Sequence, residues 1–251
     1  MQQAVSDLGK QVALVTGAGH RIGAQIAATL HAAGMRVALH YRNSARGANE
    51  LAARCNAVRD ASAITLRADL LELPAADSLV ARTLEEFGNL DLLVNNASSF
   101  YPTPLAEIDE AQWLDLIGTN LKAPLFLSRA AAPHLHASRG AIVNIVDIHA
   151  HRPLPDYSIY CAAKAGLVAI TRSLARELAP QVRVNGVAPG TILWPEENPP
   201  DAEQSSRLIA RIPLARQGGT DDIARTVLFL GREASYVTGQ IINVDGGSSL
   251  V

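Results

Sequence analysis

Short apolar runs alternate with longer amphipathic stretches along most of the chain. The runs are rich in Val, Ile, Leu and Ala and read as strands; they cover residues 12–15, 36–41, 63–67, 90–94, 141–146, 182–187 and 241–244. Between them, apolar residues recur at helical spacing, which predicts helices over residues 22–33, 47–58, 75–87, 109–135, 158–178 and 221–230. Pro124 lies inside the predicted helix 109–135 and is expected to bend it.

The alternation of strands and helices predicts the fold class. Strands that are apolar on both faces belong to a parallel sheet covered on each side. The order β-α-β-α-β, given twice, is typical of an α/β protein with a doubly wound parallel sheet, the Rossmann fold. We expect a flexible N-terminus over residues 1–10 and one domain over residues 11–251. Residues 190–217 are loop-rich and are the expected substrate loop.

Composition and charge narrow the function classes. The chain has 251 residues, of which 48% are hydrophobic and 18% charged, as in a soluble globular protein with a large core. A formal net charge of −2 gives no reason to expect a nucleic-acid partner. No apolar run approaches the roughly 20 residues that span a bilayer, and the N-terminal residues do not resemble a signal peptide. We therefore expect a cytoplasmic protein with no membrane partner.

Cysteine and histidine positions offer no metal site. Cys55 and Cys161 form no C-x-x-C motif and have no histidine at zinc-finger spacing. Free thiols in a reducing compartment are the expected state. Cys161 directly follows a tyrosine of interest and is a weak alternative candidate for a nucleophile.

That tyrosine and a lysine lie four positions apart within the predicted helix 158–178. Residues i and i+4 are neighbours on a helix surface, so Tyr160 and Lys164 lie side by side. A nearby cation favours the phenolate and lowers a tyrosine pKa from its reference of about 10, which suits a general acid near neutral pH. The chain has only three lysines, so chance explains the spacing poorly. An ordinary cation–tyrosine contact on a helix surface is the alternative.

A glycine-rich turn connects the first predicted strand to the first predicted helix. It reads TGAGHRIG over residues 16–23. Glycines there let the backbone approach a pyrophosphate, and the helix N-terminus favours its negative charge. Because βα turns often contain glycine, the place of the turn in the first βαβ unit carries more weight than its composition. We expect a dinucleotide here, in contact with Gly17, Arg21 and Ile22.

The end of the second predicted strand indicates which dinucleotide binds. In NAD-binding proteins an acidic residue there holds the ribose 2′-hydroxyl, but residues 39–44 read LHYRNS and contain no carboxylate. His40, Arg42 and Ser44 could instead bind a 2′-phosphate by charge and hydrogen bonds. NADPH/NADP⁺ is therefore the expected cofactor. A solvated loop with an incidental arginine is the alternative.

Polar residues also follow the third and fourth predicted strands. Asp69 lies where an adenine amine could find an acceptor, and residues 95–97 end the fourth strand at the carboxyl edge, where ligands bind in such sheets. Asn120 lies inside a predicted helix, an awkward place for a short polar side chain. Either it is buried with partners and supports Lys164 through water, or it lies at the surface.

Taken together, these residues resemble the short-chain dehydrogenase/reductase family over essentially all residues after the first ten. The resemblance rests on Thr16-Gly17, Asp69, Asn95-Asn96-Ala97, Asn120, Tyr160-x-x-x-Lys164, Pro189-Gly190 and Asp245-Gly246-Gly247. It implies that Tyr160 is the acid, that Lys164 holds the nicotinamide ribose and lowers the tyrosine pKa, and that Asn120 organises a proton-relay water. It also implies a homotetramer in which the predicted helices 109–135 and 158–178 pack between subunits.

Two departures from the family pattern point to one branch of it. The family usually has a glycine at the place of Arg21 and a serine at the place of Asp147. Both departures, with the segment NNASSFYPTPL over residues 95–105, resemble the pteridine reductase branch. That branch implies that Phe100 stacks on a pterin ring, that Arg21 and Ser98 contact pterin and phosphate, and that Asp147, Tyr160 and Lys164 carry the proton transfer.

Asp147 complicates the acid. An ionised carboxylate would raise the Tyr160 pKa and oppose Lys164, so we expect Asp147 and Tyr160 to act as a coupled proton donor fed from water. An Asp147 that only caps a loop is the alternative.

The resemblance thus implies two sets of contacts. The expected cofactor contacts are Gly17, Arg21, Ile22, His40, Tyr41, Arg42, Asn43, Ser44, Asp69, Leu70, Asn96, Ala97, Ser98, Tyr160, Lys164, Pro189 and Gly190. The expected substrate contacts are Arg21, Ser98, Phe100, Asp147, Tyr160 and Trp194, although Trp194 could equally be plain loop packing.

The expected function is the NADPH-dependent reduction of a pterin or folate C=N bond. The first alternative is a carbonyl reductase of 3-oxoacyl thioesters, against which Asp147 and Phe100 argue. The second is a non-catalytic NADP(H)-binding regulator, against which the intact tyrosine–lysine pair argues.

Overall fold

The computed structural model describes residues 10–72, 74–193 and 200–251. Its centre is one sheet of seven parallel strands in the order β3-β2-β1-β4-β5-β6-β7. The strands are β1 (Val12–Val15), β2 (Arg36–Tyr41), β3 (Ala63–Arg67), β4 (Leu92–Asn95), β5 (Ala141–Ile145), β6 (Arg183–Pro189) and β7 (Ile241–Val244). The strand order reverses between β1 and β4, as in a doubly wound sheet, so the predicted fold class is confirmed.

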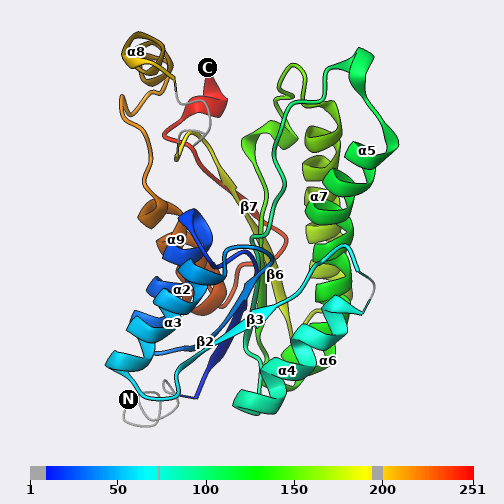
Figure 1. The fold of residues 1–251 in the computed structure, drawn as a ribbon, viewed down its shortest axis with the longest axis vertical. Coiled ribbons are helices and arrows are strands. Elements are labelled where there is room, and N and C mark those ends of the chain that lie inside the picture. The colour runs from blue at the N-terminus through cyan, green and yellow to red at the C-terminus, as the bar shows by residue number, and fades with distance from the viewer. Residues whose placement is uncertain (1–9, 73, 194–199) are drawn as a thin grey trace.

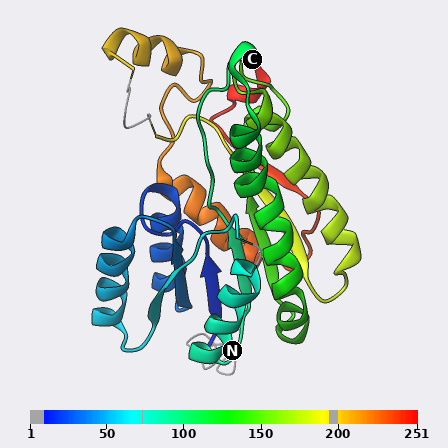
Figure 2. The ribbon, with the colours of Figure 1, turned by 45° about the vertical axis from the view of Figure 1, so that its right-hand side comes forward.

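Helices cover both faces of this sheet (Figure 1, Figure 2). One face carries α2 (Arg21–Ala32), α3 (Ala45–Val58) and α9 (Thr220–Leu228), and the other carries α4 (Ala75–Phe87), α6 (Ala123–Ser138) and α7 (Ser158–Glu177). Side chains alternate across a strand. Ala13 and Val15 therefore pack in the core beneath α2 and α9, whereas Val12 and Leu14 pack in the core beneath α4 and α6.

The strand register brings the chemistry-bearing residues to one edge. Val15 pairs with Leu39 on one side and with Val94 on the other, and Asn95 pairs with Asn144. Because the strands are parallel, the segments that follow β1, β2, β4 and β5 all leave the sheet at its carboxyl edge.

The predicted helix 109–135 is in fact three segments. It consists of α5 (Glu110–Ile117), a π-helical turn (Gly118–Lys122) and α6. Pro124 lies in the first turn of α6, directly after the π turn, and the bend expected at this proline stays a prediction. The π turn interrupts the α-helical spacing, and π turns occur frequently at functional sites.

The predicted substrate loop 190–217 contains a helix that the sequence reading missed. This helix, α8 (Ala202–Ala210), begins with a capping box in which the Asp201 side chain accepts from the Gln204 backbone and the Gln204 side chain accepts from the Asp201 backbone. It lies near the C-terminus, away from the helices that cover the sheet (Figure 1, Figure 2).

The remaining limits of strands and helices agree with the predicted ones or differ from them by one or two residues. Residues 1–9, most of the expected flexible N-terminus, and Trp194, an expected substrate contact, lie outside the described residues. Within the described parts of the chain, none of the helices combines the length and the apolar character that crossing a bilayer requires.

Stability should depend on the core beneath α4 and α6. Leu14→Ala should lower the free energy of unfolding by about 2–5 kcal/mol, because Leu14 is fully buried and its removal leaves a cavity. Val58→Ala, at a position that is 82% exposed, is the matched control and should change it by less than about 0.5 kcal/mol. Urea unfolding measures both; equal effects would contradict this account of the core.

Candidate active site

A tyrosine and an aspartate meet where β5 ends and α7 begins. The Tyr160 hydroxyl donates to Oδ2 of Asp147 at 2.6 Å, and the Tyr160 side chain is buried. The other oxygen, Oδ1, accepts from the backbone N–H of His149 at 2.8 Å, which caps a short 3₁₀ helix, Ile148–Ala150. Asp147 therefore does both things that the sequence left open: it caps a loop and it contacts the tyrosine.

The lysine lies deeper than the tyrosine. Lys164 is 2% exposed, and its Nζ donates to the Ile145 carbonyl at 3.0 Å. The same nitrogen lies 5.6 Å from the centroid of the Tyr160 ring. Burial lowers the Lys164 pKa to about 8, although the charge of Asp147 acts in the opposite direction. A surface contact, the alternative reading of this pair, is wrong because both side chains are buried.

The sequence predicted two opposing influences on the Tyr160 pKa, a downward one from Lys164 and an upward one from an ionised Asp147. Burial, followed by the charge of Asp147 and its hydrogen bond, raises the Tyr160 pKa well above its ordinary value. The net shift is thus the upward one expected from Asp147, and the lowering of the Tyr160 pKa by Lys164 stays a prediction. The phenol keeps its proton and holds it against Asp147, so the two groups form one proton-bearing unit.

Asn120 lies in the π turn and is fully buried, so a surface position is excluded. Its amide nitrogen donates to the carbonyls of Ser99 and Leu116 at 2.9 and 3.0 Å, and its amide oxygen accepts from the Ser98 hydroxyl at 2.6 Å. Asn120 therefore fixes the segment that leads from β4 to Phe100. Its water-mediated support of Lys164 stays a prediction.

A cavity of about 360 Å³ lies at the carboxyl edge of β1, β2 and β4. Twelve of the expected cofactor contacts line it: Gly17, Arg21, Ile22, His40, Arg42, Asn43, Ser44, Asp69, Leu70, Asn96, Ala97 and Ser98. Four further lining residues were not among the expected cofactor contacts: His20, Gly23, Ser99 and Thr119. His20 and Gly23 belong to the glycine-rich turn, so taking every residue of that turn as a cofactor contact would have included them.

The turn after β1 has the shape that a pyrophosphate needs. Gly17 has a φ of +63°, and a Cβ there would lie 3.0 Å from Cα of Ala97. No side chain of the described residues caps α2, and its first turn holds no acidic residue. The N-terminus of α2 therefore offers backbone N–H groups and a positive dipole end to an anion. Residues and shape together fit a dinucleotide.

His40 does not have the role that the sequence suggested. It is 2% exposed, its Nδ1 accepts from the Gly17 N–H at 3.2 Å, and its Nε2 lies 3.2 Å from the Ala68 carbonyl. Burial lowers the His40 pKa to about 4. A neutral ring that backbone groups already engage cannot hold a 2′-phosphate by charge, so that expectation is wrong.

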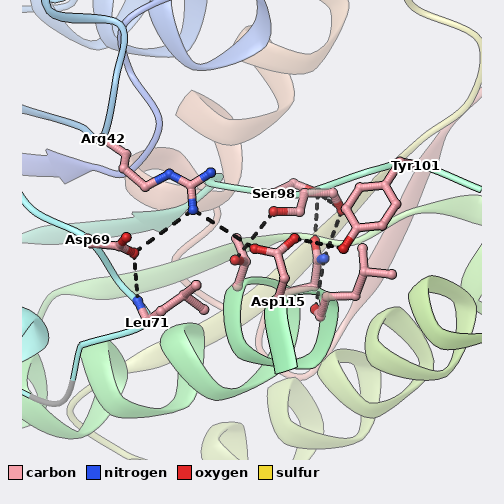
Figure 3. Close-up of polar contacts among 10 residues, drawn as sticks. Arg42, Asp69, Leu71, Ser98, Tyr101 and Asp115 are labelled. Carbon is pink, nitrogen blue, oxygen red and sulfur yellow. Dashed lines mark hydrogen bonds and ion pairs between the residues drawn. The ribbon is translucent and has the colours of Figure 1, made fainter. Parts of the chain in front are cut away.

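Arg42 lies half-exposed at the rim of the same cavity. Figure 3 shows its guanidinium pointing between two carboxylates, at 4.0 Å from Asp69 and 3.9 Å from Asp115. Asp115 also accepts from the Tyr101 hydroxyl at 3.1 Å. Exposed pairs of this length contribute about 0–1 kcal/mol each, so Arg42 is held weakly and can turn to a bound anion.

A second, larger cavity of about 1240 Å³ adjoins the first. Arg21, Ile22, Asn96 and Ser98 line both cavities. The second cavity also contains six of the other expected contacts: Phe100, Asp147, Tyr160, Lys164, Pro189 and Gly190. Leu208, Ala210 and Arg211 line it as well, and the sequence reading missed them because it predicted no helix there. Tyr41, which was also an expected cofactor contact, is not among the described residues that line either cavity.

An aromatic side chain stands at the mouth of the second cavity. Phe100 is 48% exposed. Its ring stacks on Tyr157 with centroids 4.6 Å apart and meets the edge of Tyr160 at 4.8 Å. These contacts hold the Phe100 ring in the lining of the cavity that also contains Tyr160, where a flat ligand could contact it.

Comparisons with known proteins add a family and several relatives. Residues 17–249 match the family described as Enoyl-(Acyl carrier protein) reductase. Pteridine reductase 1 of Leishmania tarentolae is 40% identical, over 95% of this chain and 96% of that protein. The 3-oxoacyl-[acyl-carrier-protein] reductase FabG of Staphylococcus aureus is 37% identical, over 94% and 96% respectively. The corresponding reductase of Synechocystis sp. is also 37% identical, over the same shares.

The backbone at Arg21 yields a test of strain at this site. Arg21 has a φ of +51°, a left-handed conformation that costs a non-glycine residue about 1–2 kcal/mol. Arg21→Gly and Arg21→Ala remove the same guanidinium, but only glycine relieves the backbone. The free energy of unfolding of the glycine variant should therefore exceed that of the alanine variant by about 1 kcal/mol. Urea unfolding compares them; an alanine variant at least as stable would show that Arg21 is unstrained.

Proposed function

The chain belongs to the short-chain dehydrogenase/reductase family and is an NADPH-dependent oxidoreductase, and on that premise we propose that it reduces a C=N bond of a pterin or folate. The observation that carries this proposal is the 2.6 Å hydrogen bond from Tyr160 to Asp147, beside the exposed ring of Phe100. A ring nitrogen must gain a proton in such a reduction, and these groups supply it next to a platform for a flat heterocycle.

The two cavities divide the work of binding. The turn at Gly17 and the N-terminus of α2 hold the pyrophosphate of NADPH. Arg42 and Ser44 hold its 2′-phosphate, and Asp69 with Leu70 holds its adenine. When bound, NADPH supplies the hydride; the protein supplies orientation and a proton.

Tyr160 and Asp147 act together in proton transfer. A phenol with a raised pKa is a weak acid on its own. Its loss of a proton beside a carboxylate would leave two negative charges in a buried place, unless a second proton arrives. We therefore assign one transferable proton to the pair, delivered to the substrate nitrogen and replaced from water in the cavity. The Lys164 ammonium, 5.6 Å from the Tyr160 ring, stabilises the negative charge that develops.

Phe100 gives the substrate its orientation. One face of its ring is covered by Tyr157, and the half-exposed remainder lines the cavity that contains Tyr160. A pterin is flat and polar and has no alcohol to hold, so stacking suits it better than an aliphatic pocket. Arg21 and Ser98, which line both cavities, contact the substrate and the cofactor.

We also propose a homotetramer in the cytoplasm. Trp113 and Leu114 on α5 and Leu125 on α6 are large apolar residues with exposed side chains, and contact with another subunit would cover them. Cys55 and Cys161 are both buried free thiols, which suits a reducing compartment. No nucleic-acid or membrane partner is part of the proposal.

The reduction of a 3-oxoacyl thioester is the second candidate. It is favoured by relatives that are 37% identical and named as 3-oxoacyl-[acyl-carrier-protein] reductases. It would use the same Tyr160 and Lys164, but it gives Asp147 and Phe100 no task.

Substrate turnover tests the proposal. The wild-type protein should oxidise NADPH with dihydrobiopterin or dihydrofolate and leave an acetoacetyl thioester unreduced. Asp147→Ser should lower kcat/KM for the pterin by about 100-fold or more, because it removes one half of the proton-bearing unit. Asp77→Asn, an exposed aspartate on α4, is the matched control and should leave turnover unchanged.

Three outcomes would contradict it. Preference for the thioester would establish the second candidate. Tight NADPH binding without turnover of any of these compounds would establish a non-catalytic regulator. Equal pterin turnover by wild type and Asp147→Ser across the pH range would remove Asp147 from the proton transfer.

A further inference from the structure

One buried histidine contacts two separate segments of the cofactor cavity. His40 belongs to β2, yet its side chain contacts the turn after β1 and the segment after β3. We propose that His40 is a positioning residue that sets the Gly17 turn for the cofactor pyrophosphate, as a neutral imidazole that does not touch the 2′-phosphate. This rests on the NADPH binding of the proposed function and is independent of the substrate.

The partners of the ring assign its proton. A backbone N–H can only donate, so Nδ1, at 3.2 Å from the Gly17 nitrogen, must be an unprotonated acceptor. A carbonyl can only accept, so Nε2, at 3.2 Å from the Ala68 oxygen, must carry the hydrogen. Only the neutral Nε2–H tautomer satisfies both partners. The pKa of about 4, lowered chiefly by burial, agrees with a ring that stays neutral.

The backbone of the same residue adds a third bond. The His40 carbonyl accepts from the Ala18 N–H at 2.8 Å, so two successive N–H groups of the turn are fixed by one residue. With these donors engaged, the turn is held in one conformation before any ligand arrives. Binding then loses less conformational freedom.

The opposite side of the turn is fixed by the segment that follows β4. The Asn96 side chain donates to the Thr16 and Gly17 carbonyls at 2.8 and 3.2 Å. The Thr16 hydroxyl accepts from the N–H groups of Asn96 and Ala97 at 2.9 and 3.0 Å. The turn is therefore held between His40 on β2 and Asn96 directly after β4. Of these two residues, His40 also contacts the segment after β3 through Ala68.

Two substitutions separate the two ring contacts. The side-chain oxygen of asparagine lies as many bonds from Cα as Nδ1, so His40→Asn keeps an acceptor for Gly17 and loses the contact with Ala68. The amide nitrogen of glutamine lies as many bonds from Cα as Nε2, so His40→Gln keeps a donor for Ala68 and loses the contact with Gly17. Each variant loses one hydrogen bond, so both should lose similar stability.

Calorimetric titration with NADPH and with NADH tests the proposal, alongside the thermal unfolding of each variant. His40→Gln should weaken binding of both dinucleotides by the same factor, about tenfold, since the pyrophosphate is common to both. His40→Asn should stay within about threefold of wild type. Arg42→Ala is the contrasting control and should weaken NADPH alone, because only NADPH carries the 2′-phosphate.

The contrary results are distinct. A loss confined to NADPH in the His40 variants would make His40 a 2′-phosphate ligand and overturn the proposal. Equal losses in both variants, in proportion to their lost stability, would show a merely structural residue and would also overturn it. A wild-type protein that binds neither dinucleotide would overturn the proposed function, and the role of His40 with it.

Discussion

All seven strands of the sheet run in the same direction, and this constraint places every reactive group of the molecule. Each strand delivers the residue that follows it to the same edge: Gly17 after β1, Asn96 after β4 and Asp147 after β5. Helices that start at this edge add their positive ends and their first-turn side chains, of which Tyr160 is one. The cofactor cavity and the substrate cavity adjoin because the strands that build them are neighbours.

At this edge of the sheet, the chemistry depends on how burial and nearby charges set the pKa of the Tyr160 phenol. Burial and the charge of Asp147 raise the Tyr160 pKa and hold the proton on the phenol, while burial lowers the Lys164 pKa to about 8. The balance favours the protonated phenol, which makes the carboxylate a part of the acid. A neutral serine in place of Asp147 would not raise the Tyr160 pKa by its charge, so the lysine would be the main charged group beside the phenol. In the proposed function, the aspartate is therefore the residue that links this geometry to the protonation of a ring nitrogen.

The sequence predicted the fold because its signals are strong and local. Apolar runs marked the seven strands, and glycine at position 17 marked the turn. The sequence could not predict features that depend on tertiary contacts. The sequence suggested His40 as a 2′-phosphate ligand because histidine can carry a positive charge. In the structure the ring is buried between Gly17 and Ala68, and this burial keeps it neutral. The spacing of apolar residues does not distinguish the π turn around Asn120 from an α-helix. The helix α8 was missed because the prolines before it suggested a loop.

The protonation state of Tyr160 tests this account most directly. In protein labelled with ¹³C at the tyrosine ζ carbon, NMR spectra over a pH series report the charge of each phenol, and Tyr160→Phe assigns the signal. The account predicts that the Tyr160 signal stays that of a neutral phenol up to pH 10 and beyond, and that it titrates at lower pH in Asp147→Ser. A wild-type Tyr160 that ionises near neutral pH would contradict it, since the lysine alone would then control the acid.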